Sequence, residues 1–422
     1  MPESPHTKIR RAREIGGQAP QERTWWTSLW RPFWAVPLAI VLAAVAVGAF
    51  LPELDKVLAL DMPYIFQGGP DGARSLLSTI ATAMISVTGL VFSITMVVLQ
   101  LAANQFTPRV LDAFLGSRIT QVTLGLFAAS FVYSLTVMRS VRGDFDDIEA
   151  FVPQTSVTLA FVIVLAAIGM FLAFINHITT STQVGAIISR VGRETTSVIE
   201  TMYPAAEEAG ALPLSWSPEP GTPHAVVTVN KREGYVSQLR YAALTEKAAK
   251  ADAVIDILVA VGTHVIAGQP VARIWGMAEI DDDLSAAVHE GISLDKDRWI
   301  HQDPAYGIRR LVDIGDRALS PGVNDPTTAV QVIHELHTVL RTLVQREDPS
   351  PYVTRDGEVR LLHRPQKTAD MVRLAVEELQ HYGADTVQIR PRLEEMLEDL
   401  LEAATPVHRV AVEECLERVR AS

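Results

Sequence analysis

Residues 75–108 read SLLSTIATAMISVTGLVFSITMVVLQLAANQFTP, thirty-four residues between Arg74 and Arg109 without a charged side chain. This stretch is long enough to cross a bilayer, for which about 20 residues suffice. Small and polar residues recur in it at steps of three, four or seven, which places them on one face of a helix. They are Ser78, Thr82, Ser86, Gly89, Ser93, Gln100 and Asn104. We therefore expect a membrane-spanning helix with a polar face that does not touch hydrocarbon.

Three other segments are apolar, uncharged and of spanning length. The predicted spans cover residues 33–51, 76–103, 119–138 and 156–177. The first apolar run starts about thirty residues into the chain and has no small-residue cleavage site behind it, so we interpret it as a span rather than a signal peptide. Four spans place both ends of the chain on the same side of the membrane.

The charges beside the spans predict the orientation. Basic residues predominate before the first span, between the second and third, and after the fourth, whereas acidic residues predominate in the other two loops. Positive charge is retained on the cytoplasmic side, so we expect the N- and C-termini in the cytoplasm. Trp25, Trp26, Trp30 and Trp34 fit an aromatic belt at the start of the first span.

Composition divides the chain into five parts. Residues 1–32 are a basic N-terminal segment, 33–180 the membrane domain, 181–223 a connector broken by prolines from Pro204, 224–280 a small β module and 281–422 a helical domain. Strands are predicted in residues 224–230, from residue 234, and in 253–261 and 270–275, with a helix in 239–251. Further helices are predicted in residues 304–319, 326–344, 368–381, 387–403 and 406–419. The predicted fold class is an α-helical membrane protein with four transmembrane helices, followed by a cytoplasmic α+β region.

Within the β module, residues 261–272 read VGTHVIAGQPVA. This string resembles the turn of biotinyl- and lipoyl-like barrel-sandwich domains. The lysine hairpin of those domains has no counterpart here, so a swinging-arm function is not implied. We interpret this part as a barrel-sandwich-like module for assembly or ligand binding.

The densest polar chemistry lies in residues 302–329, QDPAYGIRRLVDIGDRALSPGVNDPTTA. The two Asp-Pro pairs predict helix starts, each with an acidic N-cap before a proline at the first helical position. The candidate polar cluster is Asp303, Arg309, Asp313, Asp316, Arg317, Asn324, Asp325 and Thr327. One interpretation is a helix stabilised by ion pairs of Asp313 with Arg309 and Arg317. The alternative is an anion or nucleotide pocket at the helix beginning at Pro326.

The same string resembles the signature of a large bacterial family of predicted membrane proteins, domain of unknown function 2254. The end of the second span resembles that family too, in residues 99–102 (LQLA) and 104–109 (NQFTPR). The resemblance covers nearly the whole chain. It implies a multi-pass protein of the bacterial plasma (inner) membrane, with a four-span N-terminal half followed by a cytoplasmic domain. It carries over no activity.

Several classes of function are disfavoured. The net charge of −12 argues against a nucleic-acid partner. The single cysteine, Cys415, excludes an intramolecular disulfide. His301, His334 and His337 lie near acidic residues, but the His-Glu-x-x-His spacing of a metal site is missing. No Gly-x-Ser-x-Gly motif is present either. We therefore expect no metal, no cofactor and no enzymatic activity.

Three functions remain open. The first is an oligomeric channel or channel-like transporter, in which the second span lines the path and the cytoplasmic region regulates or assembles it. No charged residue lies inside any predicted span, which favours passive conduction over proton-coupled transport. The second is a membrane-anchored sensor or scaffold whose cytoplasmic domain binds a ligand or partner. The third, a membrane-bound enzyme, requires a pocket with a metal or perturbed acids. We favour the first, with the lipid bilayer and further copies of the chain as partners.

Overall fold

The computed structural model describes residues 33–58, 66–105, 118–143, 150–181, 183–206, 215–230 and 233–421. The chain forms two compact units, one spanning Gln21–Gln183 and one that includes Val184–Ser422, and each is described by itself. The predicted basic segment 1–32 and much of the two charged loops at 106–117 and 144–149 lie outside the described residues.

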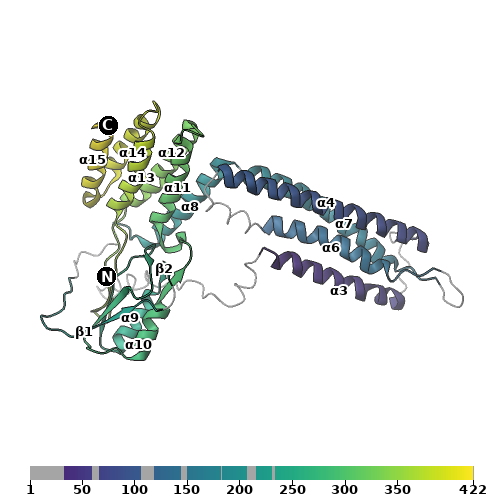
Figure 1. Cartoon of the computed structure of the whole chain (residues 1–422), viewed down its shortest axis with the longest axis horizontal. Helices are drawn as coiled ribbons and strands as arrows, with labels where there is room; N and C mark the ends of the chain where they lie inside the picture. The colour runs from purple at the N-terminus through teal and green to yellow at the C-terminus, as the bar shows by residue number, and fades with distance from the viewer. Residues whose placement is uncertain are drawn as a thin grey trace, which may run out of the picture. The chain divides into compact units, whose positions relative to one another are not determined.

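The first unit consists of four long helices that lie side by side (Figure 1). They are α3 (Ala35–Leu58), α4 (Pro70–Gln105), α6 (Arg118–Met138) and α7 (Gln154–Ser181). All four are long and apolar enough to cross a membrane, which confirms the predicted helices at these places. Helix α4 has 36 residues. At about 1.5 Å per residue it is far longer than the roughly 30 Å of a bilayer's hydrocarbon core.

Helix α6 packs against α3, α4 and α7. The approach to α3 is close because residue 125 is glycine: a Cβ there would lie 2.8 Å from Cδ1 of Ile40 and 3.0 Å from Cα of Pro37. The fully buried Tyr133 donates its hydroxyl to the carbonyl of Ser156, 3.0 Å away. Asp55 of α3 accepts hydrogen bonds from the backbone N and the hydroxyl of Ser156, at 3.1 and 2.8 Å, and so satisfies a free N–H in the first turn of α7.

The second unit contains two sheets. The five-stranded sheet has the order β1 (His224–Thr228), β5 (Pro270–Trp275), β3 (Val254–Ile257), β8 (Glu358–Leu362) and β7 (Tyr352–Arg355). Its strands are antiparallel except for the β3–β8 pair. The smaller antiparallel sheet has the order β4 (His264–Val265), β2 (Gly234–Leu239) and β6 (Ile292–Asp295). Helices α9 (Tyr241–Lys250) and α10 (Asp282–Gly291) share a core with these strands.

The rest of the second unit is a helical bundle. After the short η2 (Ile300–Gln302), it comprises α11 (Pro304–Leu319), α12 (Pro326–Val344), α13 (Thr368–Tyr382), α14 (Ile389–Ala403) and α15 (Pro406–Ala421). Helix α11 packs against α12 and α13, and α14 packs against α12 and α15. The predicted helices are confirmed here, and α11 and α12 begin and end at the predicted residues.

Two features differ from the sequence analysis. Residues 281–422 are not purely helical, because β6, β7 and β8 lie there and β8 pairs with β3 of the predicted β module. The turn of the β7–β8 hairpin is Asp356-Gly357, with φ of 57° and 89°. Asp-Gly is a recognised hairpin signal that the long helical patterns around it overshadowed.

The second difference concerns the predicted connector 181–223, which includes helix α8 (Val184–Met202). Apolar residues of α8, such as Ile188, Val191 and Ile199, are buried, and the helix packs against α11 and α12. It ends just before Pro204, as the prolines of the connector predict.

The barrel-sandwich interpretation of the β module at residues 224–280 stays a prediction.

Candidate functional site

The polar stripe of α4 faces away from the other three helices. Its described members are all exposed: Ser78, Thr82, Ser86, Gly89, Ser93 and Gln100. The opposite side of α4 is buried in the core of the unit through Leu77, Ile80, Met84 and Val91. The side chain of Asn104 lies outside the described residues. Among the described residues of this unit, no helix covers the polar stripe, whereas the opposite side of α4 packs against the other helices.

Two hydroxyl groups of the stripe are hydrogen-bonded within α4. Ser86 donates to the carbonyl of Thr82 and Ser93 to the carbonyl of Gly89, both at 2.9 Å. At Gly89 an added Cβ would meet nothing within 4 Å, so the backbone is open to a close neighbour. The primary amide of Gln100 has two donors and an acceptor and is the most demanding group of the stripe. Large apolar residues flank the stripe, among them Ile85, Leu90, Phe92 and Val97.

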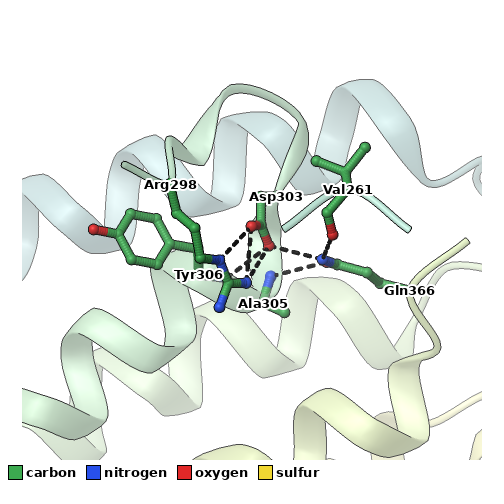
Figure 2. A network of polar contacts seen from close by, with 6 residues as sticks. All are labelled: Val261, Arg298, Asp303, Ala305, Tyr306 and Gln366. Atoms are coloured by element: carbon green, nitrogen blue, oxygen red, sulfur yellow. Dashed lines mark hydrogen bonds and ion pairs between the residues drawn. The ribbon is translucent and has the colours of Figure 1, made fainter. Parts of the chain in front are cut away.

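In the second unit, Asp303 lies at the centre of a polar network (Figure 2). Its side chain is 1% exposed. As the N-cap of α11 it accepts a hydrogen bond from the backbone N of Tyr306 at 3.0 Å. The Nε and Nη2 atoms of Arg298 each donate to it at 2.9 Å, and Nε2 of Gln366 donates at 2.7 Å. A buried carboxylate with this many donors is fully compensated.

Gln366 and Arg298 extend this network to other parts of the chain. Gln366 also donates to the carbonyl of Val261 at 3.1 Å and accepts from the backbone N of Ala305 at 3.1 Å. The guanidinium group of Arg298 lies 5.0 Å from the centre of the Tyr306 ring. Gly262 has a φ of +88°, and a Cβ there would lie 2.4 Å from Oδ2 of Asp303. The network thus joins the strand region to the starts of α11 and α13.

A second group lies further along α11 and includes a residue of α13. Nε of Arg309 donates to Asp313 at 2.8 Å, as predicted, and Nη1 donates to Glu378 of α13. Burial and a hydrogen bond with Glu378 raise the pKa of Asp316 to about 8. The hydrogen bonds from Arg309 and Asp316 hold the pKa of Glu378 below its usual range. A hydrogen bond between two carboxyl groups requires one proton, and these opposite pKa shifts favour Asp316 as its carrier. Arg317, another predicted member, is exposed.

The third group lies at the start of α12. Asp325 accepts hydrogen bonds from the backbone N and the hydroxyl of Thr328, at 3.1 and 2.6 Å, and these bonds lower the pKa of Asp325. Asn324 has a φ of 49°, and Asn324 and Thr327 are exposed. The capping carboxylate occupies the helix terminus at which the sequence analysis considered an anion, and its negative charge disfavours one there.

The eight residues of the predicted cluster thus fall into three separate groups, to which the structure adds Arg298, Gln366 and Glu378. Among the histidines considered as metal ligands, His337 is bonded to Asp399 at 2.7 Å and His334 is exposed. Over the described ranges of the chain, no group of three His, Cys, Asp or Glu residues is arranged to hold a metal ion.

Four apolar helices of spanning length followed by a mixed helical and sheet region define a multi-pass membrane protein. The family model described as "Predicted membrane protein (DUF2254)" matches residues 30–399, so the chain belongs to this family. This confirms the resemblance noted from the two motifs.

Similar proteins include the uncharacterized proteins Rv1290c of Mycobacterium tuberculosis and Mb1321c of Mycobacterium bovis. Each is 30% identical over 390 residues, which cover 90% of this chain and 74% of the relative. No solved structure matches the chain.

Proposed function

We propose that the protein is an oligomeric channel or channel-like transporter of the bacterial plasma (inner) membrane. In this proposal α4 helices from several copies line the path, and the second unit is a cytoplasmic regulatory or assembly domain with both termini on its side of the membrane. The observation that carries the proposal is the outward-facing polar stripe of α4. The basic residues beside the predicted spans support the orientation.

A single chain surrounded by lipid should hide polar groups and expose apolar ones. Helix α4 does the reverse along the stripe, since Leu77 and Met84 are buried while Ser86 and Gln100 are exposed. An amide in hydrocarbon is costly unless another helix or water satisfies it. Further copies that turn the same face toward one axis would remove that cost. The small side chains of the stripe permit close approach between such helices.

The chemistry of the stripe also suggests the mode of transport. Hydroxyl and amide groups are neutral, and residues 75–105 of α4 contain no Asp, Glu, Lys or Arg. A path lined by them would conduct ions or small solutes passively, without a titrating carboxylate for proton coupling.

The sensor or scaffold is the second candidate, and one observation favours it. Ser86 and Ser93 already donate to carbonyls of their own helix and do not require water. In that case the stripe is a dry contact between copies, and function resides in a ligand or partner of the second unit.

Cysteine accessibility distinguishes these two candidates. In a Cys415→Ser background, Ser93→Cys and Phe92→Cys place single thiols on adjacent residues, so nearly at the same depth, on the stripe and on the apolar flank respectively. The full chain is reconstituted in vesicles and treated with a charged, membrane-impermeant thiol reagent. A water-lined path predicts modification of Ser93→Cys and none of Phe92→Cys. Protection of both thiols in folded protein would contradict the channel.

A further inference from the structure

Two carboxyl groups meet across the interface of α11 and α13. Asp316 of α11 and Glu378 of α13 are hydrogen-bonded to each other, and such a bond requires one proton between them. Oδ1 of Asp316 is buried and has no hydrogen-bond partner in the part of the chain that the structure describes. Glu378, by contrast, accepts a bond from Arg309. The proton therefore belongs on Asp316 and the negative charge on Glu378.

Asp316 is partly buried where α11 packs closely against its neighbouring helices. At Gly315, next to Asp316, a Cβ would lie 2.5 Å from Cδ2 of Leu379 and 3.3 Å from Cγ1 of Val332. Ionised Asp316 would be repelled by two further carboxylates, those of Glu378 and Asp313. Loss of the proton would leave three carboxylates, those of Asp313, Asp316 and Glu378, near the guanidinium group of Arg309, which bonds Asp313 and Glu378.

The charged residues of α8 and α12, which also pack on α11, are not among the groups that act on Asp316. The groups that act on Asp316 are Glu378 of α13 and, from its own helix, Arg309 and Asp313. In α12, Glu335 accepts from Ser189 of α8 at 3.3 Å, and His337 and Arg341 are bonded to Asp399 of α14. The charged residues along α8, none of which is among the groups acting on Asp316, are Arg190, Arg193, Glu194 and Glu200.

We propose that Asp316 and Glu378 form a proton-binding joint, in which one shared proton holds α11 against α13 and its loss loosens this interface. Helix α11 also packs against α8, which follows the last span in the sequence. Helix α8 of the second unit is thus in contact with one of the two helices that form the joint. This inference concerns the second unit alone and does not depend on what the spans conduct.

The sign of the pH dependence follows from the two states of Asp316. The closed joint raises the pKa of Asp316 to about 8. In an open joint the pKa returns toward its ordinary value of about 3.9. The closed state therefore binds the proton more tightly. The free energy that favours the closed joint falls as the pH rises between these two values, and it is constant above them. Glu378, whose pKa is lowered, affects closure only in acid below its ordinary range.

Hydrogen exchange of the full chain in detergent tests the joint. Exchange accelerates with pH at every amide, so peptides from α14 give the baseline. We expect the exchange rates of peptides from α11 and α13 to rise more steeply with pH than those of α14. The additional rise is up to about a factor of ten per pH unit between about pH 5 and pH 8. Asp316→Asn keeps a donor toward Glu378 but cannot titrate, and it should follow the baseline.

Glu377→Gln is the matched control, because Glu377 is the preceding residue of α13 and pairs with Arg418 of α15 instead. It should keep the steep wild-type dependence. If Asp316→Asn does not fold, Glu378→Gln replaces it. This substitution removes the negative charge next to Asp316, so it should reduce the additional pH dependence of exchange in α11 and α13. The proposal would be overturned if the exchange rates of wild-type α11 and α13 rose with pH no more steeply than those of α14. It would also be overturned if the steeper rise persisted in Asp316→Asn, or in Glu378→Gln where that variant replaces it.

Discussion

Asp303 has a structural role that exceeds that of an ordinary helix cap. Its buried carboxylate holds Arg298 and Gln366, so several distant parts of the second unit depend on one side chain. Asp325 occupies the equivalent place on α12, but its carboxylate accepts its hydrogen bonds from Thr328, in the first turn of the same helix. The two residues therefore form a natural comparison of a buried hub with a simple cap.

We expect Asp303→Ala to lower the free energy of unfolding by about 3–5 kcal/mol, because Arg298 and Gln366 lose their common partner. Asp325→Ala should lower it by only about 1 kcal/mol, the usual cost of a lost N-cap. Thermal unfolding of the full chain in detergent measures both. Equal shifts of the unfolding midpoint would show that the network contributes no more than capping.

At the scale of single residues, the sequence predicted what is local. The Asp-Pro pairs correctly placed Asp303 and Asp325 as caps, and the spacing of Arg309 and Asp313 predicted their ion pair. Arg298, Gln366 and Glu378 could not be predicted, because their contacts depend on how distant segments fold together: Gln366 is 63 residues from Asp303 and Glu378 is 69 from Arg309. No periodicity in a single sequence reports such contacts.

Among the helices, α3 and α6 pack closely because residue 125 lacks a side chain. Gly125→Leu should force the two helices apart and lower the free energy of unfolding by about 1–3 kcal/mol, the usual cost of overpacking. Gly169→Leu in α7 is the control, since a Cβ at residue 169 would meet nothing within 4 Å. Heat stability of detergent-solubilised protein, followed by size-exclusion chromatography, reports the difference. A tolerated Gly125→Leu would mean that this helix contact is looser than described.

The elements were predictable to different degrees. Long apolar runs and capped helices have strong local signals, so the four spans and the start of α11 at Pro304 emerge from the sequence. The hairpin of β7 and β8 has strands of only four and five residues and was missed, although Asp356-Gly357 marks its turn. Helix α8 was not predicted, because the connector was assigned from the prolines that follow this helix.

On the scale of the whole molecule, the direction in which α4 turns its polar stripe decides whether that stripe can line a path between copies. The sequence predicted a polar stripe but not its direction within the bundle, since that requires knowing that Leu77, Met84 and Val91 form the packed side. In the described residues the stripe faces away from its own bundle. Membership of a family of predicted membrane proteins agrees with the spans and assigns no transported ion or solute.

Single-channel recording on the purified protein in planar bilayers tests the channel proposal most directly. Wild type is compared with Ser86→Leu and Gln100→Leu on the stripe, and with Ile85→Leu on the exposed apolar flank as the control. We predict discrete currents that both stripe substitutions alter and that Ile85→Leu leaves unchanged. Silence of well-folded wild type across a range of salts and voltages would contradict the channel and favour the membrane-anchored sensor or scaffold.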